Sequence, residues 1–327
     1  MTTSMADIRT FASPWKIRAL PSFVENNPLT KATYKGLVGD YHFGEDVACC
    51  FQKDNGNLCL HLHRRGWLIE LLDGTVTLLG NDCASTQFDL DSRLIADRNR
   101  YNNEKRRQER LASICHLVAQ KAIRLDQLSH LRTRLESLKA RTNAFASEFG
   151  PTTRRQLIAL ARSGKPDVLI KGVRLRPYED ELGKQKHERS VIQTKLGTLN
   201  GLDLVRPDSF YRLFEAMEDV ARAHGEAEML GEKPRAAEVD RLAGRLGDFD
   251  RILREGERLL ALEASLLDND LLLLCYLVHD PTELDAIMVK LMNDTGQAGG
   301  RKKARAWFAE KNQALATALG IDKIERY

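Results

Sequence analysis

Residues 49–63, CCFQKDNGNLCLHLH, gather side chains that bind transition metals. This stretch holds three of the chain's six cysteines and two of its eight histidines. The dipeptide Asn55-Gly56 at its centre predicts a β-hairpin with a two-residue turn, because both central residues of such a turn need a positive φ. In that pairing Cys50 lies opposite His61, and this register decides on which face every other side chain of the hairpin lies.

Side chains alternate along a strand, so the predicted hairpin has one apolar face for a core and one face of metal-ligand types. The second face carries Cys50, Cys59, His61 and His63. Opposed Cβ atoms lie about 5 Å apart, close enough for three of these donors to reach one ion, with Glu70, Cys83 or His42 as a further donor. Tetrahedral zinc takes three or four such donors. We therefore expect a candidate zinc site here, structural rather than catalytic.

The interpretation that we favour for this stretch involves no metal. A hairpin with one face in water often places histidine there, and cysteine is among the residues most often buried in cores. The chain has no Cys-x2-Cys pair, which is the spacing most typical of zinc sites. Without a metal, the stretch is one hairpin of an ordinary small sheet.

The second group with binding chemistry is the stretch 98–110, RNRYNNEKRRQER. Its six basic and two acidic residues leave a net charge of +4, equal to the formal net charge of the whole chain. Arginine and asparagine contact phosphates and base edges in nucleic acids. The residues expected to make such contacts are Arg98, Arg100, Asn103, Lys105, Arg106, Arg107 and Arg110.

A smaller basic group, RKKAR, opens the last predicted helix. Positive charge in a first helical turn opposes the helix dipole, which favours a negatively charged partner such as DNA or RNA. The residues concerned are Arg301, Lys302, Lys303 and Arg305. For both basic groups the simpler alternative is a solvated helix face with internal ion pairs, such as those that Glu104 or Glu109 would make with nearby arginines. An acidic protein is a third candidate partner.

Composition limits the class of protein. The 327 residues are 43% hydrophobic and 29% charged, which is typical of a folded, soluble chain. The strongest apolar run, LLLLCYLV, has eight residues, whereas a membrane span needs about 20. The first residues lack the apolar stretch of a secretory signal, and the cysteines do not suggest a disulfide framework. We expect a cytoplasmic protein.

Hydrophobic periodicity divides the chain. Residues 31–80 alternate in short strand-like runs with Asn-Gly and Asp-Gly turns. Residues 89–147 lack proline and glycine and carry apolar residues at spacings of three, four and seven, which predicts one long amphipathic helix, or two with a tight break. The remainder is predicted to be helical, including a charged helix over residues 178–196. For residues 167–177 the pattern fits either a small hairpin or an extended crossing.

The predicted fold is therefore α+β and predominantly α. It consists of a small antiparallel β-meander (1–85), a long helical arm with coiled-coil character (86–150) and a helical C-terminal region (151–327). No motif of a phosphate loop, a nucleophile elbow or a His-Glu-x-x-His site is present.

Three functions follow from these features. The first is a non-catalytic assembly or adaptor protein that binds a partner, or itself, through the arm, because an extended amphipathic helix needs another surface to cover its apolar stripe. The second is a nucleic-acid-binding accessory protein that uses residues 98–110. The remote third is a metal-dependent enzyme that uses the hairpin of residues 50–63.

Overall fold

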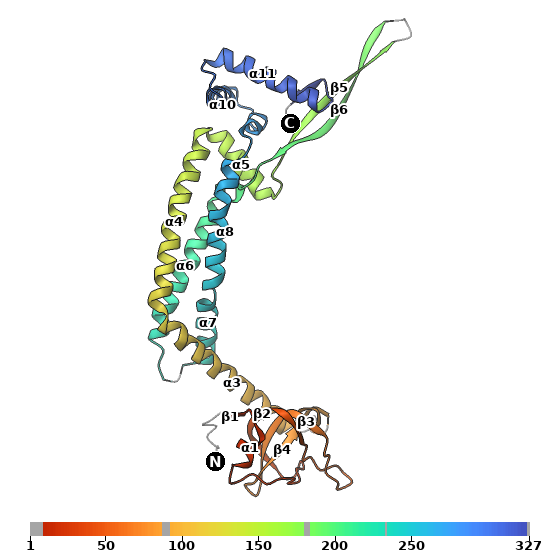
Figure 1. The fold of residues 1–327 in the computed structure, drawn as a ribbon, viewed down its shortest axis with the longest axis vertical. Coiled ribbons are helices and arrows are strands. Elements are labelled where there is room, and N and C mark those ends of the chain that lie inside the picture. The colour runs from red at the N-terminus through yellow and green to blue at the C-terminus, as the bar shows by residue number, and fades with distance from the viewer. Residues whose placement is uncertain (1–8, 87–91, 180–183, 233, 326–327) are drawn as a thin grey trace. The chain divides into compact units, whose positions relative to one another are not determined.

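The computed structural model describes residues 9–86, 92–179, 184–232 and 234–325 (Figure 1). They belong to two compact units. The first comprises Met1–His116 with Gly231–Ala243, and the second comprises Leu117–Leu230 with Gly244–Tyr327. The boundary between the units falls inside the helical stretch that the sequence predicts over residues 86–150.

The first unit is built on a four-stranded sheet of order β1-β2-β3-β4. Three strands form the predicted antiparallel meander: β2 (Tyr34–Ala48), β3 (Leu62–Leu71) and β4 (Val76–Gly80). The edge strand β1 (Arg9–Phe11) lies outside that prediction and pairs in parallel with β2. The helices of this part of the chain are α1 (Pro14–Arg18), α2 (Asn81–Thr86) and α3 (Ser92–Ala119).

Both hairpin turns of the sheet hold three residues, whereas the sequence predicts two. In the first turn the N–H of Gly56 donates to the carbonyl of Lys53, and the N–H of Lys53 donates to the carbonyl of Asn57, both at 2.9 Å. Gly56 has φ 84°, and Gly74 has φ 84° in the second turn. This is a type I turn followed by a left-handed residue. The same dipeptides that suit a two-residue turn also suit this longer one.

The start of α3 packs on the sheet. Leu94 and Tyr101 are each 1% exposed and lie in one core with Trp67 and Ile69. The rings of Trp67 and Tyr101 meet edge to face, with centroids 5.8 Å apart, an arrangement that aromatic pairs favour. This contact gives the small sheet the helical cover that it needs to be stable in water.

The core of the second unit is a helical bundle. Its long helices are α4 (Lys121–Glu148), α6 (Pro207–Glu228) and α8 (Phe249–Leu267). Leu128, Leu131, Leu135 and Leu138 form the apolar stripe of α4 and are at most 5% exposed. They pack in one core with side chains of α6 and α8, so the stripe is covered within this chain. The predicted break in the long helix falls at Gln120, whereas the predicted coiled-coil character is not confirmed.

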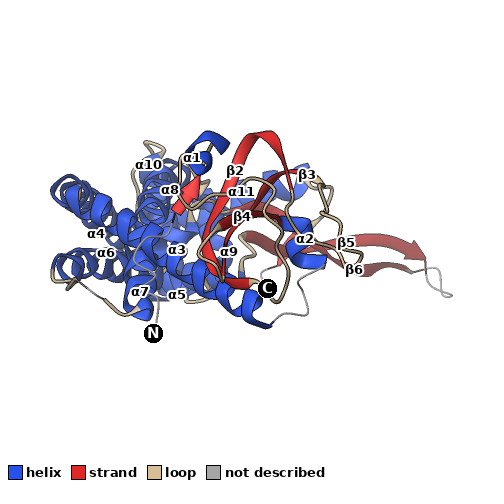
Figure 2. Ribbon diagram, turned by 90° about the horizontal axis from the view of Figure 1, so that it is seen from below, coloured by secondary structure: helices blue, strands red, loops and turns tan. Residues whose placement is uncertain are grey.

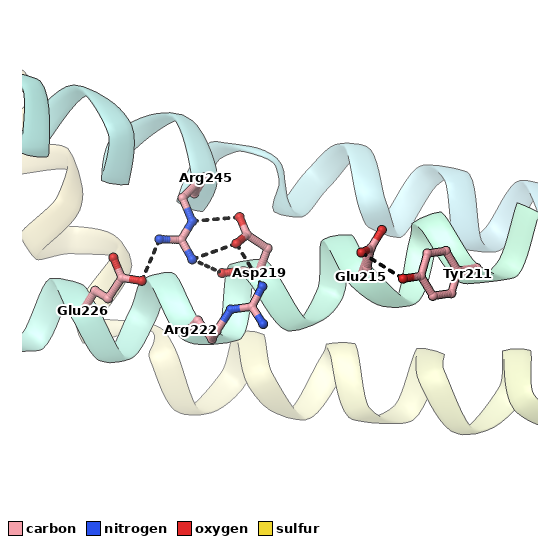
Figure 3. A network of polar contacts seen from close by, with 6 residues as sticks. All are labelled: Tyr211, Glu215, Asp219, Arg222, Glu226 and Arg245. Carbon is pink, nitrogen blue, oxygen red and sulfur yellow. Dashed lines mark hydrogen bonds and ion pairs between the residues drawn. The ribbon is translucent and has the colours of Figure 1, made fainter. Parts of the chain in front are cut away.

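A polar network joins α6 to the last residues of α7 (Ala236–Gly247), which belong to this unit from Gly244 onward (Figure 3). The guanidinium of Arg245 donates to both carboxylate oxygens of Asp219, at 2.7 and 2.8 Å, and to Glu226 at 2.8 Å. Arg222 donates to the same Asp219. The hydrogen bonds from Arg245 hold the pKa of Asp219 below its usual range. Since the Arg245 side chain is only 17% exposed, this forked contact is better shielded than a surface ion pair.

The C-terminal part of the second unit contains a second sheet, of order β6-β5-β7. Its strands are β5 (Asp167–Glu179), β6 (Gln185–Thr198) and β7 (Lys323–Glu325). The charged helix predicted over residues 178–196 is therefore wrong, because the β-branched residues Val191, Ile192 and Thr194 pair against β5. The helical elements around the sheet are α5 (Pro151–Ser163), η1 (Leu202–Val205), η2 (Leu271–Leu273), α9 (Leu274–Leu277), α10 (Pro281–Asp294) and α11 (Arg301–Ala318).

Within the described ranges, no helix combines the length and the apolar character required to cross a lipid bilayer.

Two helical glycines test the packing of the bundle. A Cβ on Gly256 of α8 would lie 2.6 Å from the side chain of Leu131, which is 3% exposed. We expect Gly256→Ala to lower the free energy of unfolding by about 1 kcal/mol, because overpacking outweighs the gain in helix propensity. A Cβ on Gly225 of α6 would have no other atom within 4 Å. We therefore expect Gly225→Ala to raise the free energy of unfolding by about 0.5–1 kcal/mol. Denaturant titration followed by circular dichroism measures both, and equal shifts in the two variants would contradict the packing.

Candidate nucleic-acid interface and thiol cluster

The basic stretch 98–110 lies on α3, and most of its charged side chains contact this chain. The guanidinium of Arg98 lies over the ring of Trp67, 5.3 Å from its centroid. Arg100 is 3.6 Å from the carboxylate of Asp97. Cation–π contacts and exposed ion pairs of this kind each contribute little on their own, but they direct these side chains toward the protein.

Lys105 belongs to a network around Asp40 on β2. Its ammonium donates to the Asp40 carboxylate at 2.6 Å, and the hydroxyls of Tyr101 and Thr10 donate to the same carboxylate at 2.8 and 2.6 Å. Burial alone would raise the pKa of Asp40, but these hydrogen bonds outweigh it and lower the pKa below its usual value. The network ties α3 to β1 and β2, so Lys105 has a structural role.

Arg107 and Arg110 contact the segment before and within α7 in the same unit. Arg107 donates to Glu104 at 3.1 Å and to the carbonyl of Pro234 at 3.0 Å. Arg110 forms an ion pair with Asp240. Asn103 and Arg106 are exposed. The predicted nucleic-acid surface on α3 is thus reduced, because three of its six cations, Lys105, Arg107 and Arg110, hold α3 in place.

The second predicted basic group opens α11, as expected from the sequence. Arg301, Lys302 and Lys303 are exposed, and the ammonium of Lys303 donates to the carbonyl of Ala298 at 2.9 Å. Arg305 forms a forked pair with Asp285, at 2.7 and 2.6 Å. Part of this charge is therefore neutralised by α10.

The sequence prediction missed a ribbon formed by β5 and β6 in the second unit. The two strands pair from Asp167 and Thr198 out to Glu179 and Gln185, whereas β7 pairs only with 171–173 of β5. Beyond that point both strands are exposed on both faces. Figure 1 and Figure 2 show the ribbon extending past the helices at its base.

Alternation of side chains gives this ribbon two different faces. One, here called the cationic face, carries Arg174, Arg176, Tyr178, Lys186, Glu188 and Ser190. The other, here called the apolar face, carries Leu175, Pro177, His187, Arg189 and Val191. The sequence VRLRPY, residues 173–178, already alternates between apolar and basic residues. That period of two is the signal by which the ribbon could have been found.

The cationic face has an excess of positive charge. Arg176 lies directly opposite Glu188, so among residues 174–178 and 186–190 the face carries three cations and one carboxylate. Arg174 donates to the carbonyl of Gly320 at 2.9 Å, which anchors the base of the face to the end of α11. The exposed ring of Tyr178 lies opposite Lys186. Cations and an aromatic ring on one side of a ribbon form a surface suited to phosphates and bases.

The predicted metal ligands of the 49–63 hairpin do not come together. With the three-residue turn, Ala48 pairs with Leu62 and Gln52 with Leu58, which differs by one residue from the predicted register. A shift of one residue moves a side chain to the opposite face. Cys50 is consequently 2% exposed in a separate core cluster.

The other predicted ligands also have different surroundings. His61 is exposed. Nδ1 of His63 lies 3.1 Å from the hydroxyl of Tyr41, and burial lowers the pKa of His63. Of the four predicted residues, only Cys59 lies in a cluster of donor atoms.

That cluster consists of Cys49, Cys59 and Cys83, whose sulfur atoms all lie within 4.8 Å of one another. The Sγ atoms of Cys59 and Cys83 are 3.4 Å apart. Burial raises the pKa of Cys49 and of Cys83. For Cys59, burial is outweighed by hydrogen bonds from the His61 N–H and the Cys83 thiol, and its pKa is lowered. Cys59 is therefore the thiol of this cluster most readily ionised.

The Asp40 network makes the stability of the first unit depend on pH. The pKa of Asp40 is lowered on folding, so its contribution is present above about pH 4, the unfolded value, and is lost as pH falls through the folded pKa. We expect Asp40→Asn to lower the free energy of unfolding by about 1–3 kcal/mol at neutral pH, with a smaller difference from the wild type in acid.

Asp46→Asn is the matched control, because the ion pair of Asp46 with Arg64, at 3.1 Å, is exposed, and its loss should change stability by less than about 0.5 kcal/mol. Thermal melts of both variants across pH measure the effect. A constant difference for Asp40→Asn down to the acid limit would disprove the role of its charge.

Comparison with known proteins adds no relative to this description: no protein-family model, no curated protein and no solved structure matches the chain.

Proposed function

We propose that this protein is a non-catalytic accessory protein that binds double-stranded nucleic acid through the cationic face of the β5–β6 ribbon. The observation that carries the proposal is the projection of an exposed two-stranded ribbon, whose described residues place three cations, one tyrosine and one carboxylate on one face. A two-stranded ribbon has little stability of its own in water. A ribbon of this length with both faces exposed is suited to a partner that it contacts along its length.

The dimensions of a duplex favour this partner. The major groove of B-DNA, about 12 Å wide, admits a two-stranded β-ribbon. Arg176 and Lys186 on the ribbon would neutralise phosphates, and Tyr178 offers a ring for an apolar or stacking contact. These side chains supply charge without a base-specific pattern of donors, so the expected binding depends weakly on sequence and strongly on salt.

We favour this surface over the predicted one on α3. There, Lys105, Arg107 and Arg110 pair with Asp40, Glu104 and Asp240. A phosphate would have to displace these carboxylates, which offsets part of the gain from binding. The exposed residues Arg301, Lys302 and Lys303 of α11 belong to the same unit as the ribbon and add positive charge to that unit.

Charge reversal on the cationic face tests the proposal. We expect Arg176→Glu with Lys186→Glu to weaken duplex binding at least tenfold at low salt. The slope of log affinity against log salt should fall by about 2, since each phosphate contact contributes roughly one. Fluorescence anisotropy with a labelled random-sequence duplex, over a series of salt concentrations, measures both quantities.

Two further double variants make this test specific. Arg154→Glu with Arg155→Glu on α5 changes the net charge equally at exposed positions off the ribbon and should leave binding nearly unchanged. Arg100→Glu with Arg106→Glu examines the exposed part of α3. Absence of duplex binding at low salt would refute the proposal, and loss of binding in the α3 variant alone would return the site to residues 98–110.

The apolar face of the ribbon favours a second candidate function, which is assembly through self-association. Leu175 is 43% exposed and Val191 is 49% exposed on this face. β6 is the outer strand of its sheet, and an edge strand offers unpaired backbone donors and acceptors to another chain. The sequence suggested assembly through the apolar stripe of α4, but that stripe is covered by α6 and α8. An assembly role would therefore use the ribbon.

Leu175→Thr with Val191→Thr tests self-association, since threonine keeps a high β-propensity while it removes apolar surface. Light scattering on the purified wild type should then show a dimer. The variant should have a dimer dissociation constant at least tenfold higher than that of the wild type. Ser190→Thr, on the cationic face, is the control that should leave the dimer intact. A wild type that stays monomeric at high concentration would exclude this function.

A further inference from the structure

Three cysteines from separate segments of the first unit converge in one place. Cys49 follows β2, Cys59 follows the three-residue turn, and Cys83 lies on α2. Their sulfur atoms lie within 4.8 Å of one another, and none of the chain's six cysteines forms a disulfide bond. The cluster is independent of the ribbon and of the nucleic-acid proposal.

The spacing of these sulfur atoms fits a tetrahedral metal ion. Zinc binds thiolate sulfur at about 2.3 Å, which places two sulfurs of a tetrahedral site about 3.8 Å apart. This zinc-site distance lies between the 3.4 Å that separates the Sγ atoms of Cys59 and Cys83 and the 4.8 Å that is the upper limit for the three sulfur atoms. A disulfide needs sulfurs at about 2.05 Å and would leave one of the three thiols unused.

The sulfur of Cys59 has polar contacts of the kind that orient the ligands of a metal site. It accepts hydrogen bonds from the backbone N–H of His61 and from the thiol of Cys83, and Lys53 contributes a favourable charge. Cys49 in turn accepts a hydrogen bond from the N–H of Gly80. These contacts help to fix the positions of two of the three sulfur atoms.

His63 is the candidate for the fourth donor, although its nitrogens lie outside the group of sulfur atoms within 4.8 Å of one another. Its Nε2 is buried and has no hydrogen-bond partner among the described residues, whereas its Nδ1 contacts the hydroxyl of Tyr41. Metal-binding histidines generally have such a partner on the second nitrogen, which orients the ring. A Cβ on Gly80 would lie 2.9 Å from this Nε2, so His63 lies against the same glycine whose N–H contacts Cys49.

We propose that Cys49, Cys59, Cys83 and His63 form a structural zinc site of the Cys3His type. The ion would join the hairpin to α2 beneath the start of α3, because the three cysteines share a core with Leu94 and Tyr101. Four protein ligands leave no open position for a substrate, so the site stabilises the fold and does not catalyse a reaction.

Metal analysis and cobalt titration test this site. Protein purified under reducing conditions should contain one equivalent of zinc. After chelation, the apoprotein should bind one equivalent of Co²⁺ with tetrahedral and thiolate charge-transfer absorption. Cys59→Ser should weaken cobalt binding at least tenfold, and because Cys59 is only partly buried, circular dichroism should show an intact fold. His63→Ala should weaken binding while the thiolate absorption remains.

Cys50→Ser is the matched control, because Cys50 is adjacent to Cys49 but belongs to another core cluster. It should retain one equivalent of cobalt. The inference fails if the reduced apoprotein shows no thiolate–cobalt absorption at stoichiometric metal, or if Cys50→Ser weakens binding as much as Cys59→Ser. A Cys59–Cys83 disulfide in protein that takes up no metal after reduction would likewise overturn it. Retention of full affinity in His63→Ala would exclude His63 as a ligand.

Discussion

Burial of the leucine stripe on α4 is the constraint on which the second unit depends. Each fully buried leucine contributes about 1.5–3 kcal/mol relative to exposure, and Leu128, Leu131, Leu135 and Leu138 are all nearly inaccessible to water. To cover them, α6 and α8 must lie along α4, and the absence of a side chain at Gly256 gives Leu131 its space. Leu199 and Leu202, which follow β6, join the same core and fix the base of the ribbon to the bundle.

In the first unit, a difference of one residue in a turn decides which side chains meet. A two-residue turn would have placed Cys50 and His61 across from each other. The three-residue turn around Gly56 instead buries Cys50 in one core cluster and brings Cys49 and Cys59 to Cys83. Asn-Gly is compatible with either turn, so local sequence does not distinguish them. The choice is made by the tertiary contacts of the residues on each side.

The sequence was sufficient to predict the secondary-structure elements that have a strong local signal. The meander, the long helical stretch with its break, and the helix that begins at Arg301 all appear where periodicity and turn residues predict them. The sequence was not sufficient to predict strands that form only by pairing with a distant segment of the chain. Residues 185–198 are charged and carry few apolar side chains, so only their pairing with β5 makes them a strand. For the same reason the basic residues of α3 stand out in the sequence, whereas the β5–β6 ribbon was not predicted.

The stretch 98–110 and the ribbon show that the net charge of a stretch of sequence does not indicate how much charge folding leaves exposed. The segment 98–110 carries a charge equal to the excess of the whole chain, yet Asp40 and Asp240 are carboxylates distant in sequence that neutralise part of it. On the ribbon, Arg176 and Lys186 lie beyond the residues of β5 that pair with β7, and Glu188 is the only carboxylate among the described residues of their face. Attraction of a polyanion depends on the charge that folding leaves exposed at the surface, and not on the net charge of a stretch of sequence.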